Sequence, residues 1–448
     1  MNPQMLFRSA AIAVASLALL SPAVAQRNKP VKLYPDDLDV TPASLRGDKS
    51  IRYDYDIVYV RSPRAGNDKG SRWAEIAHPQ LMDPGADLML LHPDGTEEVL
   101  VEGGATGAIT DPVVTFDGEW VLFSHMKGLE GTNMHGKFPS GGADIYKLHL
   151  GSRKLVRLTH QEYTPNTGAA DWASDFRSNE KGKTRIEYGV LNLGAYPLPG
   201  NRLVFTSNRD GFIPPKHPAP CLQLFTMDDD GKNVEKIGHL NIGVALHPVV
   251  LKDGRIMFSS LESQGLRSGI LWGLWHINPD GTYWGPLYSA FLPGGAPDAF
   301  HFQTQLSDES IVVEQYYNQN NNGFGSYHKI PPRPPEGALA FGPGWRDDPR
   351  NTALRFGRFY NAKPKLQRLP FTPAGAESLT PFVTISDRAS DTSVLNDKDS
   401  PRVGKFTHPS GAPDNHMLTV WSPGPVNHQN GLKLPASDGG IYLIVGGK

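Results

Sequence analysis

Residues 247–260 read HPVVLKDGRIMFSS. A short apolar run leads into Asp253-Gly254, and a second apolar run ends at Phe258 and two serines. The glycine of an Asp-Gly pair supplies the positive φ that a tight β-hairpin needs. This stretch therefore predicts two antiparallel strands joined by a short turn.

The same pattern recurs along the chain. Residues 112–124 read PVVTFDGEWVLFS and residues 197–207 read PLPGNRLVFTS, and each copy leads to a third strand with an aromatic residue near its middle. Looser copies include Ile57, Phe302 and Thr407. One small sheet cannot bury both of its faces, whereas several sheets packed around an axis can. The repeats predict an all-β fold, a β-propeller of six four-stranded blades.

The propeller is predicted to span residues 51–448, after an N-terminal extension over 26–50. Two polar or Pro-rich stretches, 160–188 and 330–385, are predicted to be long loop insertions. A seventh blade has room only in the second of them. The first copy starts at its second strand, so either residues 36–50 supply the missing strand or the sequence is one section of a longer protein.

The N-terminus has the features of a secretory signal. Met1–Arg8 carries one positive charge, Ser9–Leu20 is small and apolar, and Ala23-Val24-Ala25 fits a signal-peptidase site. We therefore expect cleavage after Ala25 and a periplasmic or secreted protein. A membrane anchor is the weaker alternative, because the apolar run is shorter than a bilayer span. No later segment is apolar enough to be a transmembrane helix.

Composition excludes several classes of function. The net charge of −2 and the lack of a basic stripe argue against a nucleic-acid partner. Cys221 is the one cysteine, so an internal disulfide, a CxxCH attachment site for covalent c-type haem and a cysteine-based zinc cluster are excluded. We expect Cys221 to be a buried residue at a strand edge. The sequence contains no GxSxG, P-loop, HExxH or dinucleotide motif, which favours a non-enzymatic role.

Polar residues recur near the start of the first strand of each repeat, a few residues before the turn that ends it. Asp111-Pro112, His247-Pro248 and His408-Pro409 each stand six residues before an aspartate, and His301 stands seven before Asp308. Tyr196-Pro197 occupies the similar place in the third repeat. If the repeats superpose, these side chains ring one mouth of the central channel. Asp111, Tyr196, His247, His301 and His408 are therefore candidates for binding a ligand.

Two interpretations of this ring remain open. Histidine and aspartate can hold a divalent metal, so His247, His301, His408 and Asp111 form a candidate metal site. The same groups can bind a polar small ligand or serve as a general acid or base. Alternatively, a polar residue before proline simply hydrogen-bonds a neighbouring strand. The sequence predicts no cofactor beyond this candidate metal.

Two resemblances support the fold. Residues 203–211, LVFTSNRDG, resemble the PD40 (WD40-like) signature of TolB-type propellers. The layout from about residue 50 onward, including the terminal DGGIYLI, resembles the middle propeller of hydrazine synthase alpha-subunit-like proteins. The second resemblance implies a redox complex that carries haem, and this chain departs from it by having no CxxCH.

Three functions follow as hypotheses. The first is a binding or scaffold domain for a protein partner or small ligand at the channel mouth. The second is a hydrazine-synthase-alpha-like subunit that supports a redox complex. The third is a metal-dependent enzyme that uses the His/Asp ring.

Overall fold

The fold is known from a computed structural model of the chain. The residues that it describes are 38–63, 84–129, 141–161, 164, 190–211, 221–238, 244–261, 272–288, 299–316, 324–338, 375–383, 392–394, 397, 399–424 and 438–447. The predicted signal peptide (1–25) lies outside these ranges, as do most of the predicted insertions. Within them, no helix is both long enough and apolar enough to cross a bilayer.

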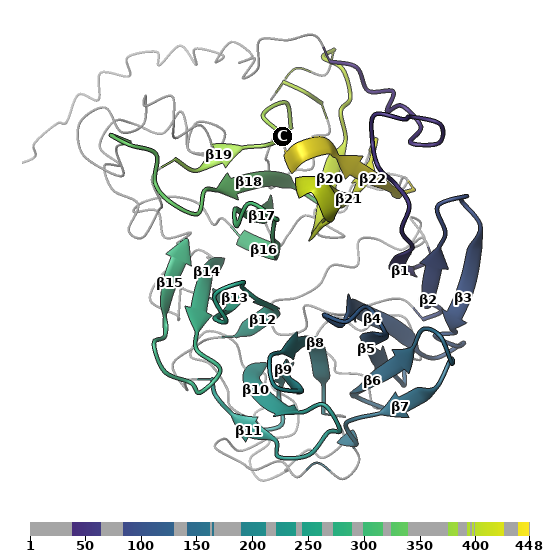
Figure 1. The fold of residues 1–448 in the computed structure, drawn as a ribbon, viewed down its shortest axis with the longest axis vertical. Helices are drawn as coiled ribbons and strands as arrows, with labels where there is room; N and C mark the ends of the chain where they lie inside the picture. The colour runs from purple at the N-terminus through teal and green to yellow at the C-terminus, as the bar shows by residue number, and fades with distance from the viewer. Residues whose placement is uncertain are drawn as a thin grey trace, which may run out of the picture.

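The described strands form six antiparallel units that follow one another around a central axis (Figure 1). The first two contain β1 (Ile57–Arg61), β2 (Asp87–Leu91), β3 (Glu97–Val101), β4 (Ala108–Val114), β5 (Trp120–Met126), β6 (Ala143–His149) and β7 (Leu155–Arg157). The third and fourth contain β8 (Asn192–Leu198), β9 (Arg202–Ser207), β10 (Gln223–Asp228), β11 (Glu235–Lys236), β12 (Ala245–Val250), β13 (Ile256–Leu261), β14 (Trp272–Ile277) and β15 (Gly285–Tyr288). The fifth and sixth contain β16 (Ala299–Gln305), β17 (Ile311–Tyr316), β18 (Ser326–Ile330), β19 (Glu377–Ser378), β20 (Lys405–Gly411), β21 (Met417–Ser422) and β22 (Gly440–Ile444).

This arrangement confirms the all-β propeller predicted from the repeats. The strands of each unit run in sequence from the axis outward, so β4, β8, β12, β16 and β20 are innermost (Figure 1). The first and sixth units have three strands each among the described residues. In the fifth unit the outermost strand is β19, which belongs to the stretch predicted as an insertion (330–385). The rest of that stretch, where a seventh blade had room, lies mostly outside the described ranges.

Asp-Gly turns join the two inner strands where the sequence predicted them. Gly254 has a φ of 90°, a conformation that costs other residues energy, and the Asp253 side chain accepts a 3.0 Å hydrogen bond from the N–H of Arg255. The apolar residues on both sides alternate toward the two neighbouring blades. The local turn chemistry therefore sets the register that buries them.

Each pair of successive blades, from the first to the sixth, encloses its own apolar cluster among the described residues. Between the third and fourth blades, for example, Val204 and Leu224 pack with Ile256 and Phe258, all 0% exposed. A further cluster collects small and apolar residues from five blades around the axis, among them Cys221. Cys221 is 1% exposed, as its position beside a strand predicted.

Main-chain hydrogen bonds also connect successive blades near the axis. Each joins a residue near the start of an outer strand of one blade to a residue near the start of the innermost strand of the next blade. The connections are Ala86–Ile109, Ala143–Val190, Leu222–Ala245 and the paired bonds of Gly325–Phe406, with a parallel pairing of Trp272 and Ala299. We call these connections the inter-blade stitches.

The signature stretch LVFTSNRDG has a structural role. The Arg209 guanidinium lies 5.1 Å from the ring centres of Phe205 and Phe225 and donates a 2.6 Å hydrogen bond to Asn192. Burial lowers the pKa of Arg209 to about 10. The motif therefore closes the end of the third blade.

Candidate functional site: a ring around the channel

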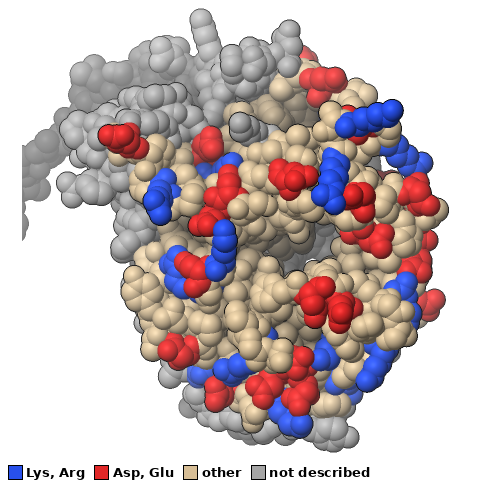
Figure 2. All heavy atoms as spheres, viewed as in Figure 1, with Lys and Arg blue, Asp and Glu red and all other residues tan. Residues whose placement is uncertain are grey.

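A β-bulge interrupts every described innermost strand at the same place. The register shifts lie between Thr110 and Val113, Leu193 and Tyr196, Leu246 and Val249, His301 and Gln303, and Thr407 and Ser410. One residue in each bulge has a positive φ: Asp111 (55°), Gly194 (61°), His247 (52°), Phe302 (49°) and His408 (52°). We call these five residues the channel ring, because they occupy the same place on successive innermost strands. Figure 2 shows a hollow at the centre of the propeller.

The predicted superposition is right for Asp111, His247 and His408 and wrong for the other two candidates. Gly194 takes the place expected for Tyr196, and Phe302 takes the place expected for His301. Both stand six residues before the turn, as the other ring members do. A spacing of six alone would have found them, but the search favoured titratable side chains.

Tyr196 and His301 have different positions. Tyr196 packs against the cluster between the third and fourth blades and forms part of that interface. His301 is 3% exposed, and its ring lies 4.7 Å from that of Trp272 and 5.7 Å from that of His247. His301 therefore backs the ring instead of facing the channel.

Three ring members stack on one another across consecutive blades. The Phe302 ring centre lies 4.4 Å from that of His247 and 3.9 Å from that of His408, with tilts of 41° and 30°. These distances fall at or just below the usual range for packed aromatic pairs. The fourth, fifth and sixth blades thus share one continuous aromatic surface.

The other ring members are tied to their neighbours through polar contacts. A carboxylate oxygen of Asp111 accepts a 3.1 Å hydrogen bond from the N–H of Gly194. Gln303 donates to the carbonyl of His247, and Glu314 lies beside Thr407 and the main chain of His408. Each bulge is therefore held by the adjacent blade.

Burial keeps His301 and the two ring histidines, His247 and His408, neutral at pH 7. Burial lowers the pKa of His301 to about 3 and that of His408 to about 4, although His408 keeps a larger part of its surface open to the channel. Burial, together with the charges of His301 and His408, lowers the pKa of His247. Neutral imidazoles can donate or accept hydrogen bonds and can bind metals.

Asp111 shows the opposite behaviour, and this leads to a prediction. Burial raises the pKa of Asp111 to about 6, so the folded state holds its proton more tightly than the unfolded state does. Its contribution to stability is complete below pH 3.8 and is lost as the pH rises through 6. We expect Asp111→Asn to raise the free energy of unfolding by about 1–3 kcal/mol at pH 8.

The gain should vanish below pH 4, where both proteins carry a neutral side chain. Asparagine also tolerates a positive φ and keeps an oxygen for the N–H of Gly194. Urea unfolding of both proteins at pH 4, 6 and 8 measures the difference. A gain of the same size at every pH would contradict the assignment.

The described residues contain no group of three His, Cys, Asp or Glu side chains that already has metal-binding geometry. Phe302 lies between His247 and His408, so one ion bound by both would require the phenyl ring to move. The residues do not fit covalent haem either. Cys221 is buried in an apolar cluster, where burial raises its pKa to about 12.

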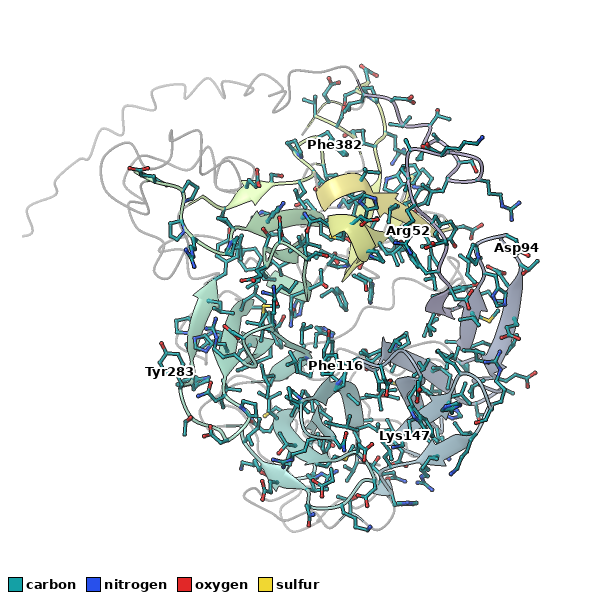
Figure 3. The ribbon with its side chains drawn as sticks, in the orientation of Figure 1. Arg52, Asp94, Phe116, Lys147, Tyr283 and Phe382 are labelled. Carbon is teal, nitrogen blue, oxygen red and sulfur yellow. The ribbon has the colours of Figure 1, made fainter. Side chains whose placement is uncertain are left out.

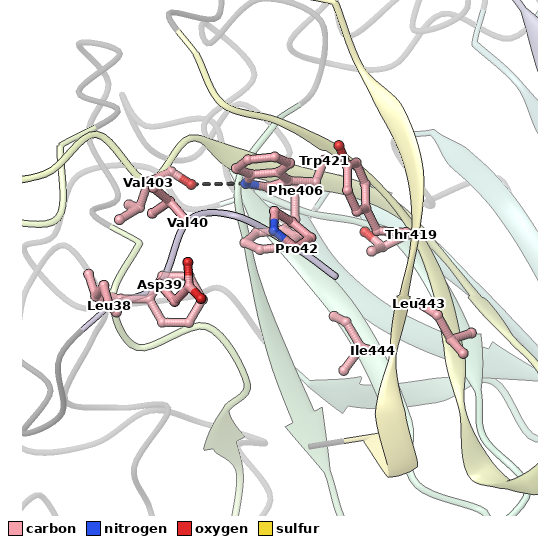
Figure 4. Close-up of a pocket in the computed structure, with 12 residues that line it drawn as sticks. Leu38, Asp39, Val40, Pro42, Val403, Phe406, Thr419, Trp421, Leu443 and Ile444 are labelled. Carbon is pink, nitrogen blue, oxygen red and sulfur yellow. Dashed lines mark hydrogen bonds between the residues drawn. The ribbon is translucent and has the colours of Figure 1, made fainter. Parts of the chain in front are cut away.

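A second concavity lies away from the channel, against the sixth blade (Figure 4). Its cavity of about 200 Å³ is lined by Leu38, Asp39, Val40, Pro42, Phe382, Val403, Phe406, Thr419, Trp421, Tyr442, Leu443 and Ile444. The Trp421 Nε1–H donates a 2.9 Å hydrogen bond to the carbonyl of Val403. The N-terminal extension therefore lies along the last blade before it reaches β1 (Figure 1).

Comparison with known proteins gives a fold. No family profile matches the chain, and no curated protein sequence matches it. Among solved structures, hydrazine synthase from Kuenenia stuttgartiensis matches 87% of this chain and 43% of its own, with a TM-score of 0.50 and 16% identity. TolB from Acinetobacter baumannii matches 61% of this chain and 52% of its own, with a TM-score of 0.33 and 16% identity.

This chain thus spans less than half the length of the hydrazine synthase chain that it matches. The predicted resemblance to the hydrazine synthase propeller is confirmed as a likeness of fold. The chain is a β-propeller whose architecture resembles that of hydrazine synthase.

Proposed function

We propose that this propeller is a binding module whose ligand, a small molecule or a side chain of a partner protein, is held at the channel ring. The observation that carries the proposal is the choice of residues at the bulges. Glycine or asparagine adopts a positive φ at low cost, yet Asp111, His247, Phe302 and His408 stand there. Phe302 costs about 1–2 kcal/mol in that conformation, whereas aspartate and histidine adopt it more often than most residues and at a lower cost.

Backbone strain of this kind concentrates at binding and catalytic sites. If the bulge had only a structural role, glycine would suffice at every ring position, as Gly194 does in the third blade. The other four side chains supply a carboxylate, two imidazoles and a phenyl ring. This set suits a ligand that has both a flat apolar part and hydrogen-bonding groups.

The turn beside the ring adds an exposed anchor. Phe116 lies in the β4–β5 turn, is 65% exposed, and is directed toward the centre of the propeller (Figure 3). Exposed aromatic side chains often provide the main contacts of a binding surface. Phe116 therefore supports a ligand or partner that approaches the channel from this face.

A divalent metal is one candidate ligand of the ring, and its presence can be measured directly. If a metal is the ligand, protein purified from its native host should contain close to one per chain, and His247→Ala/His408→Ala should lose it; the Phe302 ring, which contacts both histidines, must then move aside. His149→Ala, which removes a histidine from the end of β6, is the control and should keep the metal. Inductively coupled plasma mass spectrometry gives the content, and native mass spectrometry of the same samples detects a small-molecule adduct or a bound partner.

A metal, adduct or partner that the double variant retains would place binding elsewhere and refute the ring as the site. Protein that carries none of them would refute it as well. A cytochrome that co-purifies and is lost in the double variant would favour the second candidate, a subunit that supports a redox complex. The fold likeness over 87% of the chain is the observation that supports that candidate.

We further propose that the protein works outside the cytoplasm. The signal sequence predicted over residues 1–25 and the predicted cleavage after Ala25 support export. A periplasmic or extracellular location is compatible with the mixed charge of the surface, where acidic and basic side chains are interspersed (Figure 2).

A further inference from the structure

The first blade has an unpaired strand edge on its inner side. β1 pairs with β2, and no strand within the described ranges pairs with the other edge of β1, which lies nearest the centre of the propeller (Figure 1). In each of the other five blades, the strand equivalent to β1 pairs there with an innermost strand, which is β4, β8, β12, β16 or β20. The row of N–H and C=O groups along β1 is therefore a template for another extended strand.

Equivalent pairings place Val60 at a defined position on β1. Val60 pairs with Leu88, two residues after Ala86, which forms the stitch to the second blade. The same relation to a stitch identifies Ser124 in the second blade and Ser259 in the fourth. Each serine pairs with the residue that precedes a ring residue: Ser124 with Thr110, before Asp111, and Ser259 with Leu246, before His247. A strand added at β1 would therefore carry its own ring residue directly after the residue that faces Val60.

The contact between the sixth and first blades is incomplete in two further respects. The inter-blade stitches join the five successive blade pairs, but none of these bonds joins the sixth blade to the first. Leu418 in β21 is half-buried, whereas its equivalents in the second to fifth blades are 0% exposed: Leu122, Val204, Met257 and Val312. The innermost strand of the next blade helps to cover these residues, as Phe300 does for Met257. A strand beside β1 would cover Leu418 in the same way.

The described part of the N-terminal extension does not supply this strand. Residues 38–50, one of its predicted sources, contain no β-strand. Leu38, Val40 and Pro42 instead line the cavity against the sixth blade. The strand that completes the first blade therefore has to come from another segment.

We propose that the inner edge of β1 binds an extended segment of a partner protein, which completes the first blade by strand addition. The innermost strands of the other blades define the chemistry of this segment. The residue two places before the ring position is apolar in four of the five strands: Ile109, Ala245, Phe300 and Phe406. Proline directly follows the three ring residues that have polar side chains, Asp111, His247 and His408. We therefore expect the partner segment to contain an apolar residue, any residue, a histidine or aspartate, and then proline.

Strand addition explains both parts of this recognition. Main-chain hydrogen bonds to β1 provide affinity, and the side chains that alternate along the segment provide specificity. One face of the added strand would pack between the blades, and its histidine or aspartate would stand beside the channel ring. The proposal does not depend on a ligand at the ring, because β1 contributes no ring residue.

The probe for this site is a fluorescein-labelled peptide that copies residues 244–251 of the chain, VALHPVVL. We expect saturable binding of one peptide per full chain, measured by fluorescence anisotropy. Neighbouring N–H groups of a strand point to opposite edges, and only one edge of the peptide faces β1. Methylating the main-chain nitrogen of either Ala245 or Leu246 in the peptide should therefore weaken binding by about tenfold or more in one case and leave it unchanged in the other.

Disulfide trapping tests the register. A peptide with Leu246→Cys should form a disulfide with Val60→Cys protein, because these residues would face each other. Tyr59→Cys is the matched control, since its side chain points to the opposite face of β1, and it should trap about tenfold less peptide. Cys221 is 1% exposed and should not compete. Mass spectrometry of the non-reduced protein gives the yield.

Lack of peptide binding, an equal effect of the two methylations, or equal trapping by the two cysteine variants would overturn the proposal. Binding that appears only after residues 26–37 are removed would assign the edge to the N-terminal segment of the same chain, and a dimer that the peptide dissociates would assign it to a second copy. Either result would overturn the partner as occupant. His247→Ala/His408→Ala should bind the peptide as the wild type does, so failure at β1 is distinguishable from failure at the channel ring.

Discussion

Lowering the pH from 6.5 to 5.0 is expected to cost this protein about 3–4 kcal/mol through two histidines, His301 and His328. Each is 3% exposed, and burial lowers the pKa of each to about 3. The unfolded chain takes up protons near pH 6.5, whereas the folded chain does not until about pH 3. Stability is therefore complete above pH 6.5 and is lost as the pH falls below it.

The measurement is the free energy of urea unfolding at several pH values, for the wild type and for His301→Gln/His328→Gln. For each pH unit below 6.5, the free energy of unfolding of the variant should fall by about 2–3 kcal/mol less than that of the wild type. Burial raises the pKa of Glu314 and of Asp111, which acts in the opposite direction, but both groups are common to the two proteins and cancel in the difference. His328→Gln alone should show half the effect.

Equal slopes for the wild type and the double variant would show that neither histidine is buried and neutral. The same loss of stability at low pH would affect the channel ring, because His301 packs behind the ring residue His247. A fall in stability of several kcal/mol is a large share of the 5–15 kcal/mol typical of a folded domain.

Trp272→Ala is expected to have the largest effect of any single substitution described here. Trp272 is fully buried among the apolar residues near the axis, pairs with Ala299 in one of the inter-blade stitches and packs on His301. Removing a buried tryptophan costs about 3–5 kcal/mol, because the cavity it leaves cannot be filled. It would also remove the aromatic ring against which His301 packs.

Two independent readouts test this role. The midpoint of urea unfolding should fall sharply for Trp272→Ala, and much less for Trp272→Phe or for Trp120→Ala at the partly exposed end of β5. The pKa of His301 should move toward its ordinary value, so stability should depend less steeply on pH than in the wild type. A loss of stability with an unchanged pH dependence would show that Trp272 does not keep the pKa of His301 low.

The sequence was sufficient to predict the fold and part of the site. Turn residues such as Asp117-Gly118 and Asp253-Gly254 are readable because their backbone conformation restricts the residue type. Bulges are harder to predict when the residue with positive φ is Asp, His or Phe, because the residue type alone does not indicate the bulge. Tyr196 and His301 were predicted to be in the ring because the prediction favoured titratable side chains, and Gly194 and Phe302 were missed because neither is titratable.

Other features depend on contacts between blades and leave no local pattern. Glu314 looks like an ordinary strand residue, yet it is fully buried beside the sixth blade. Tyr283 looks like part of a simple turn, yet the structure gives it a φ of 54° and leaves it 72% exposed. Sequence periodicity identifies the blades, while the blade interfaces decide which side chains are available for binding.

The inter-blade stitches have a consequence for how such a protein can change over evolutionary time. Five successive blade pairs are fastened by main-chain bonds near the axis, so deleting or duplicating an internal blade would break the fastening on both of its sides. An open solenoid can gain or lose a repeat and expose only one new interface. We therefore expect the number of blades to change rarely, and substitutions in the exposed hairpins to leave the bonds near the axis intact.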